Sequence, residues 1–311
     1  LLFSTSLRAM ETDNYYVWGH ELHDSRAHIN RYFDLTLEKA VKKANSLRSP
    51  QSCFALTALV GKELRSHWVH DNPVENWLMQ ELNSEEMWPA TLDYVAQSIY
   101  RDPYLPYIPK FGLAPSVQVS GYYFGMDKLS HFASTGQDYF WIYLRERERV
   151  VAEQKATGAA ILFGILDENS VHGYAASGVF SFADLEANYR GLLFYRRLCF
   201  EQEKAYLSQS ESGQWKVTRP FNMAEYVDGA WDESFNLSHR LPWNWKKVAP
   251  VLEQEYCPMA SSRAVNELMR FYTTTLRPSI SRDHLNTLLS RNNPLIPKVE
   301  KSQSFSRLCR Q

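Results

Sequence analysis

This sequence has no long hydrophobic run and no excess of charge of either sign. The longest apolar stretch, Ala159–Leu166, is far shorter than the roughly 18 residues that a membrane-spanning helix needs. Lys and Arg number 34 and Asp and Glu 35, for a net charge of −1, so the basic surface on which nucleic-acid binding depends is missing. We therefore expect neither a membrane span nor a nucleic-acid partner.

Several short motifs with a recognised chemistry are also missing. There is no C-x-x-C pair, which argues against a zinc knuckle. No G-x-S-x-G segment presents a serine on a sharp strand-to-helix turn, so Ser134 and Ser181 are weak candidates for a nucleophile although histidines lie near them in the sequence. No glycine-rich loop is available to hold a phosphate group, and we expect no cofactor.

Cysteine is scarce, and its few positions are widely spaced. An even number fits two disulfides in an oxidising compartment, with three possible pairings, and free buried thiols fit equally well. The sequence begins with Leu1 rather than Met, which suggests a processed chain that has lost an export signal, or a trimmed one. We therefore expect a secreted or periplasmic protein. The four cysteines are Cys53, Cys199, Cys257 and Cys309.

The composition is typical of a folded chain with a sizeable core. Hydrophobic residues make up 44% of the 311 residues, which suffices for a single domain over 1–311 that we expect to be monomeric. Apolar residues recur at helical spacing, as at Ile29, Phe33 and Leu37, so the expected fold is mainly α. The predicted helices lie at 24–44, 53–67, 91–99, 127–147, 157–167, from 181 onward and at 261–276, with irregular stretches at 101–115 and 209–247.

The residue with the clearest chemical potential is Glu168, which ends the apolar helix predicted over 157–167. A helix without a polar face must be buried on all sides, so the carboxyl at its end is expected to lose hydration. Desolvation raises the pKa of a carboxyl, and the partial negative charge of a helix C-terminus raises it further. A carboxyl that stays protonated near neutral pH can act as a general acid on a glycosidic oxygen. The alternative is an exposed helix-terminal Glu168 beside Asp167.

A glycine-punctuated segment at 172–181 follows this carboxyl and is predicted to form a small β-hairpin that lines a cleft. The next helix begins after Ser181, where Ser181 and Asp184 resemble a capping arrangement. Asp184 is a candidate for a second carboxylate that orients water, with capping as the plainer alternative, and packing is the plainer alternative for Tyr189. The residues expected to contact substrate are Tyr174, Ser181, Asp184, Asn188 and Tyr189.

A rival interpretation is a metal site. Asp127 and His131 lie four residues apart, and so do Glu168 and His172, a spacing that places side chains on the same helix face. Two such carboxylate–histidine pairs facing each other could bind a divalent metal and support hydrolysis. Gly173 follows His172 directly, however, so the second pair is expected to straddle a helix end. A helix-start carboxylate bonded to a histidine would explain the first pair equally well.

Two stretches carry a family resemblance. They are Asp127–Phe132, with the sequence DKLSHF, and Ser177–Gly191, with the sequence SGVFSFADLEANYRG. Together they resemble an uncharacterised family of exported proteobacterial proteins, over about 119–199. The resemblance implies export from the cytoplasm and adds no catalytic role of its own.

A looser similarity is to goose-type and transglycosylase-type lysozymes, in which the acid Glu is followed by Ser, a Gly-containing strand and a helix carrying Asn and Gly. Glu168–Ser170, Gly178–Ser181 and Asn188–Gly191 occur in that order, although Ser181 stands where the strand motif has Gln. The similarity implies a lysozyme-like helical domain with a small β-hairpin, centred at about 119–200 and elaborated at both ends. It also implies cleavage of peptidoglycan glycan strands with Glu168 as the general acid.

A further similarity, to a lysozyme of predatory bacteria, implies a preference for deacetylated peptidoglycan. Such a glycan exposes amines, which an acidic pocket near Asp167, Asp184 or Glu186 would suit. Besides the glycosidase and the metal-dependent hydrolase, a third hypothesis is a non-enzymatic envelope protein that binds glycan or lipid. In that case Glu168 would be exposed to solvent or held in an ion pair.

Overall fold

The computed structural model describes residues 11–65, 72–89, 95–102, 113–149, 152–170, 173–175, 177–298 and 308–309. Helices dominate this part of the chain, as expected, and the strands are short. The α-helices are α1 (Arg26–Asn45), α2 (Cys53–Leu64), α3 (Pro73–Glu81), α5 (Asp127–Ser130), α6 (Gly136–Glu148), α7 (Glu153–Glu168), α8 (Phe182–Cys199), α9 (Pro242–Val251), α10 (Cys257–Ala260), α11 (Arg263–Thr275) and α12 (Ile280–Ser290).

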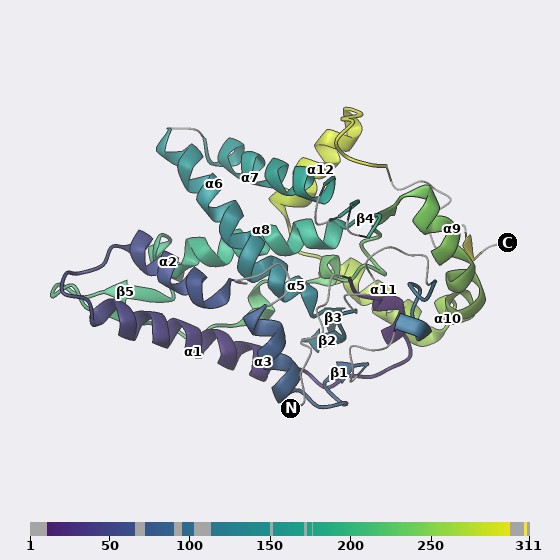
Figure 1. Ribbon diagram of the computed structural model, residues 1–311, viewed down its shortest axis with the longest axis horizontal. Helices are drawn as coiled ribbons and strands as arrows, with labels where there is room; N and C mark the ends of the chain where they lie inside the picture. The colour runs from purple at the N-terminus through teal and green to yellow at the C-terminus, as the bar shows by residue number, and fades with distance from the viewer. Residues whose placement is uncertain are drawn as a thin grey trace, which may run out of the picture.

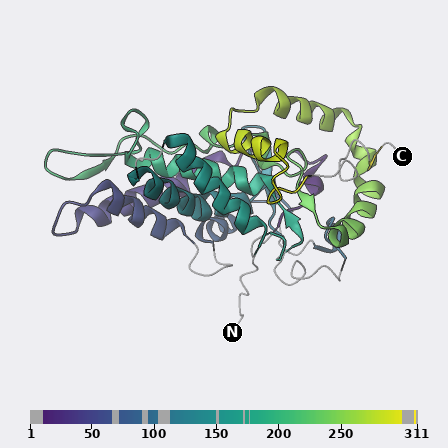
Figure 2. The same cartoon turned by 90° about the horizontal axis from the view of Figure 1, so that it is seen from above.

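The strands form three small antiparallel sheets. β1, β2 and β3 make one, β4 pairs with β7, and β5 pairs with β6 in a hairpin at one end of the molecule (Figure 2). None of the helices in the described part of the chain has the length and hydrophobicity that crossing a bilayer demands. The strands are β1 (Met87–Trp88), β2 (Ser116–Val119), β3 (Tyr122–Gly125), β4 (Val179–Phe180), β5 (Leu207–Gln209), β6 (Trp215–Val217) and β7 (His239–Arg240).

Helix α8 runs through the middle of the molecule, with α6 and α7 on one side and α1 and α2 on the other (Figure 1). Its first turn is capped as predicted, because the Ser181 hydroxyl accepts a hydrogen bond from the Asp184 N–H at 3.2 Å. Helices α6 and α8 meet at one point without side chains between them. A Cβ on Gly136 of α6 would lie 2.6 Å from the Gly191 Cα of α8, so glycine at this crossing lets the two backbones touch.

The long helix predicted over 127–147 is present, with one irregular turn. α5 continues into a π-helical turn at His131–Thr135 and then into α6. Phe132 of that turn lies in an aromatic core with Phe33 of α1 and Phe194 of α8, at ring-centroid distances between 5.4 and 5.7 Å. This core joins three helices that are far apart in the sequence, and so places α5 against α8.

The prediction that α7 is buried on all sides is wrong. Leu162, Phe163 and Leu166 are 39%, 37% and 47% exposed. Small residues explain the difference, since a Cβ on Gly164 would lie 1.7 Å from the Tyr139 hydroxyl of α6. α7 therefore packs closely through the face that carries Ile161, Gly164 and Ile165, and Leu162, Phe163 and Leu166 are left partly exposed. Glu168, at the end of α7, belongs to the buried face.

The hairpin predicted at 172–181 is also not formed. Within this segment, whose residues 172 and 176 lie outside the described part, Val179 and Phe180 pair instead with Arg240 and His239. The backbone before them turns back on the end of α7, where the Tyr174 N–H donates to the Glu168 carbonyl at 3.0 Å. The strand partner thus comes from a distant part of the sequence, which periodicity within the segment could not indicate.

All four cysteines form disulfides, so the free-thiol alternative is wrong. Cys53 at the start of α2 is bonded to Cys199 at the end of α8, and Cys257 of α10 is bonded to Cys309. α2 ends at Leu64, slightly before the predicted end. Of the helix predicted at 91–99, residues 91–94 lie outside the described part, and the rest holds a single 3₁₀ turn at Val95–Gln97.

Candidate active site

The end of α7 meets the start of α8 at Glu168. Its side chain is 2% exposed, and Oε2 accepts a hydrogen bond from the Ser181 N–H at 3.1 Å. Burial raises the pKa of Glu168 well above its usual range, and the nearby charge of Asp184 raises it further, against the smaller opposing effect of the Ser181 N–H. The predicted burial of this carboxyl is therefore confirmed, and the alternative of an exposed Glu168 is wrong.

Asp184 lies in the first turn of α8, and its pKa is shifted in the opposite direction to that of Glu168. Its Oδ1 is 2.7 Å from Lys128 Nζ, and its Oδ2 is 3.3 Å from His131 Nε2. Burial alone would raise the pKa of Asp184, but the charges of His131 and Lys128 outweigh it, so the pKa lies below the usual value. Asp184 is therefore held as a carboxylate next to a carboxyl that keeps its proton.

Lys128 of α5 is the cation at the centre of the site. Its side chain has no exposed surface, and Nζ lies 2.8 Å from Asp127 Oδ2, 2.7 Å from Asp184 Oδ1 and 2.7 Å from Glu233 Oε1. Burial would lower the pKa of Lys128, but the surrounding carboxylates raise it well above the usual value. The ammonium group is thus permanently charged and holds these carboxylates together.

A further buried carboxyl, Glu11, lies behind this group. Its Oε1 accepts from the Ser177 hydroxyl at 2.7 Å, and it is 4% exposed. Burial and the charge of Glu233 raise the pKa of Glu11 to about 8, although Lys128 lowers it. The carboxyl groups of this cluster outnumber its cations, so at neutral pH part of them must remain protonated.

His131 connects the cluster to solvent, because its side chain is 18% exposed whereas that of Asp184 is 9% exposed. Its Nδ1 faces Asn188 Oδ1 at 3.2 Å and its Nε2 faces Asp184. With the amide in this orientation, a ring carrying a proton on each nitrogen satisfies both acceptors. The site therefore combines an acid, a carboxylate and an imidazole at the point where α5, α7 and α8 converge.

The metal ligands predicted from spacing are only partly brought together. His131, Glu168 and Asp184 each offer a ligand atom, and these atoms all lie within 4.8 Å of one another. Asp127 is turned away from them, because its Oδ1 accepts from Thr12 and its Oδ2 pairs with Lys128. His172 lies outside the described residues. Asp184 thus takes the place that the spacing assigned to Asp127.

The predicted substrate-contacting residues are divided by the fold. Ser181 and Asn188 lie in the cluster with Asp184. Tyr174 is beside it, where its hydroxyl is 2.7 Å from His239 Nδ1. Tyr189 is placed elsewhere, because it is 4% exposed and lies toward the start of α12, near the Ile280 backbone. Tyr189 therefore has a packing position, as the plainer alternative held.

Three members of the cluster were not predicted. Lys128 lies within the DKLSHF stretch, and its place between Asp127 and a helical apolar run was an available signal. Glu233 and Glu11 come from distant segments, and nothing in their local sequence marks them. The Ser181 hydroxyl joins α8 to this group, since it donates to Glu233 Oε1 at 2.9 Å.

Comparisons of this chain with protein-family models, with curated proteins and with solved structures found no match.

Proposed function

We propose that the protein is a glycoside hydrolase of lysozyme-like design that cleaves the glycan strands of peptidoglycan, with Glu168 as the general acid. The observation that supports this most directly is the opposite protonation tendency of Glu168 and Asp184, whose oxygens come within 4.8 Å. Two carboxyls whose environments separate their pKa values are the usual acid and ionised partner of glycoside cleavage.

In this mechanism Glu168 protonates the glycosidic oxygen as the bond to the sugar breaks, and the Glu168 carboxylate then takes a proton from the water molecule that adds to the anomeric carbon. Asp184 remains a carboxylate because Lys128 and His131 hold it, and its charge stabilises the positive sugar ring of the transition state. Glycosidases that retain the anomeric configuration have carboxyl groups about 5 Å apart, and inverting ones about 6.5–9.5 Å. Because an oxygen of Glu168 and one of Asp184 come within 4.8 Å, the proposal takes the retaining arrangement, with Asp184 next to the anomeric carbon.

The substrate is proposed from the resemblance to lysozymes and from the chemistry of the cluster. Two disulfides are compatible with an oxidising compartment such as the one that contains peptidoglycan. An excess of carboxyl groups favours a glycan that carries amines, as deacetylated peptidoglycan does. Of the acidic residues named for this preference, Asp184 belongs to the cluster, whereas Glu186 is paired with Arg190 at 2.8 Å and with Arg282 at 3.2 Å.

The test is cleavage of native and chemically deacetylated sacculi, with mass analysis of the released fragments. Glu168→Gln keeps the shape of the side chain and can still accept the Ser181 N–H, but it cannot donate the catalytic proton. We expect glycan release to fall by about a hundredfold or more. Glu153→Gln is the matched control, since Glu153 begins the same helix and its side chain is 50% exposed. Release by Glu168→Gln at the rate of this control would refute the acid role.

A second candidate, a metal-dependent hydrolase, is favoured by the close approach of ligand atoms from His131, Glu168 and Asp184. Glu168 would then be an ionised ligand, and a bound metal would supply an activated water molecule. Chelator treatment and elemental analysis separate the two candidates. The acid mechanism predicts activity that survives chelation, whereas the metal mechanism predicts loss of activity and its return with Zn²⁺ or Mn²⁺. Under the metal mechanism, His131→Gln should also abolish metal binding.

A further inference from the structure

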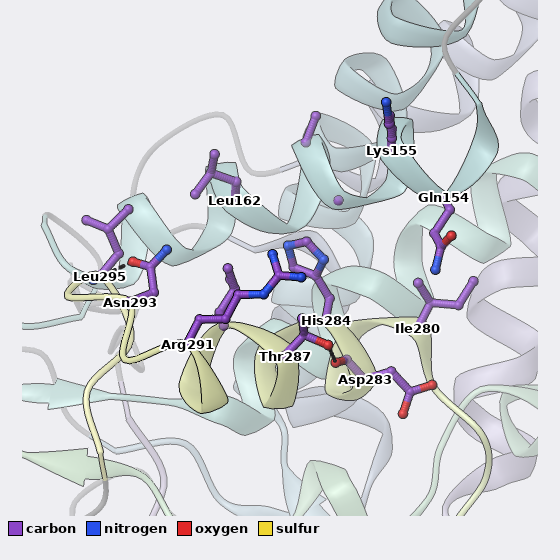
Figure 3. A pocket seen from close by; sticks show the side chains of 13 residues that line it. Gln154, Lys155, Leu162, Ile280, Asp283, His284, Thr287, Arg291, Asn293 and Leu295 are labelled. Carbon is purple, nitrogen blue, oxygen red and sulfur yellow. Dashed lines mark hydrogen bonds between the residues drawn. The ribbon is translucent and has the colours of Figure 1, made fainter.

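A groove separate from the Glu168 site lies between α7 and α12 (Figure 3), with a volume of about 740 Å³. Its α7 wall consists of one helix face that includes Lys155, Gly158 and Leu162, and its α12 wall includes His284 and Arg291. Glu168 follows Leu162 by six residues, which is well round the helix from the groove. The groove and the buried cluster thus use different faces of α7.

Two nitrogen-bearing side chains, His284 of α12 and Arg291 immediately after this helix, lie together in the groove without an anion. Figure 3 shows the Arg291 guanidinium beside the His284 imidazole. Within the described part of the chain, neither side chain has a hydrogen-bond or ion-pair partner. Burial, and then the charge of Arg291, lowers the pKa of His284, which is the effect expected where a cation approaches an imidazole and no counter-ion is present. An anion placed between them would satisfy both groups.

The acidic residue of the groove does not provide that anion. Figure 3 shows the Asp283 carboxylate pointing away from Arg291. Lys155 stands at the rim on α7, is exposed, and also has no ion-pair partner among the described residues. The groove therefore presents an excess of positive charge, in a chain whose net charge is −1.

Part of the groove is apolar. Leu162 and Ile280 are 39% and 37% exposed, and Leu288 and Leu295 also belong to the lining, which further includes the polar residues Gln154, Thr287 and Asn293. Gly158 makes room for the imidazole, because a Cβ there would lie 3.1 Å from His284 Cε1. Exposed apolar side chains that border a hollow of this size are typical of a binding site for a small molecule with an apolar body.

We propose that this groove binds a small amphiphilic anion, a phosphate or carboxylate head on an alkyl chain, with the head between Arg291 and His284. The guanidinium forms paired hydrogen bonds with the head group. The alkyl chain lies along Leu162 of α7 and along Leu295, which follows α12. Apolar and charged contacts both contribute, so neither an inorganic anion nor an uncharged amphiphile satisfies the site alone.

Octyl phosphate is a suitable probe, measured by isothermal titration calorimetry below its micellar concentration. We expect octyl phosphate to bind at least tenfold more tightly than inorganic phosphate and than octyl glucoside. Arg291→Gln should weaken binding of octyl phosphate at least tenfold, and Leu162→Ser should weaken it by a smaller factor. Arg270→Gln, an exposed arginine of α11, is the matched control and should leave the affinity unchanged.

Three results would overturn the proposal. The first is equal binding of octyl phosphate by Arg291→Gln and Arg270→Gln. The second is binding of octyl glucoside as tight as that of octyl phosphate. The third is binding to vesicles of anionic lipid without binding to monomeric octyl phosphate, which would assign the surface to a membrane instead. Glycan cleavage is not used as a readout, so the result is independent of the role of Glu168.

Discussion

Replacing Lys128 with methionine tests the electrostatic account of the buried cluster. Methionine keeps the length and the apolar stem of the side chain and removes only the ammonium group. That group contacts three carboxylates at 2.7–2.8 Å and has no exposed surface. Removing one partner from a buried ion pair typically costs about 3–5 kcal/mol. We expect Lys128→Met to lose about that much free energy of unfolding near pH 8.

The pH dependence of this loss follows from the cited shifts. Lys128 lowers the pKa values of Asp184 and Glu11 in the folded protein, so both values rise when it is removed. The folded variant then binds more protons than the unfolded chain between about pH 5 and 8, and its stability decreases as the pH rises through that window. Below about pH 4 the carboxyls of the variant are protonated in both the folded and the unfolded state, so the difference from the unmodified protein becomes smaller.

The assay is urea unfolding near pH 5 and near pH 8 with the disulfides intact, followed by circular dichroism. Lys216→Met is the matched control, because Lys216 is exposed on β6 and has no ion-pair partner within the described residues. The control should stay within about 0.5 kcal/mol of the unmodified protein. A loss below about 1 kcal/mol for Lys128→Met near pH 8, or an equal loss at both pH values, would refute the reasoning.

Three further outcomes follow from the same site. If Asp184 lies beside the anomeric carbon, NMR of the first product should show the retained anomer, and inversion would exclude this placement. Glu168→Gln should be at least as stable as the unmodified protein near pH 8, because a buried carboxyl with a raised pKa costs stability when it is ionised. Urea unfolding measures this stability, and strong destabilisation would indicate a structural role for Glu168. Glu11, whose pKa burial raises to about 8, should make the melting temperature fall between about pH 5 and 8, and Glu11→Gln should flatten that profile.

Local patterns predicted the helices well, because the information for a helix start is carried by neighbouring residues. Ser181 was expected to cap α8, and its hydroxyl accepts the Asp184 N–H. Apolar spacing similarly placed α1 and the helix from Asp127 onward. The π-helical turn at His131–Thr135 was not predicted, since nothing in the spacing distinguishes it from an ordinary turn.

Long-range pairing was not predictable in the same way. Val179 and Phe180 have strand character, but their partners Arg240 and His239 lie far along the chain. The local sequence favoured a hairpin within 172–181, and that prediction was wrong. α7 shows a related difficulty, because composition indicates how apolar a helix is but not whether glycine and alanine will let one face pack closely while the other is exposed.

The burial of Glu168 was predicted correctly, but for a reason that is only half right. The carboxyl is not buried because α7 is enclosed, since Leu166, two residues earlier, is 47% exposed. It is buried because the backbone of Ser181 and the first turn of α8 cover it. His131 was selected by its spacing from Asp127, yet it contacts Asp184, because α5 lies against α8. Residue types were thus predictable, whereas partners depended on how the helices cross.

A second buried ionic group, which includes Glu186 and Arg190 of α8, shows why the cluster at Lys128 is unusual. Glu186 and Asp228 are paired there with Arg190 and Arg282, at distances of 2.8–3.6 Å. Each carboxylate in that group has a guanidinium partner, so packing and charge balance account for it.

The cluster around Lys128 has more carboxyl groups than cations, and Glu233 Oε2 has no hydrogen-bond partner there. Buried ion pairs add little stability compared with apolar residues of the same size, and unmatched carboxyls add less still. Stability alone therefore does not explain an unbalanced cluster that reaches solvent through His131. Perturbed groups of this kind are concentrated at functional sites, which is the physical reason for proposing Glu168 and Asp184, rather than the balanced group around Arg190, as the functional site.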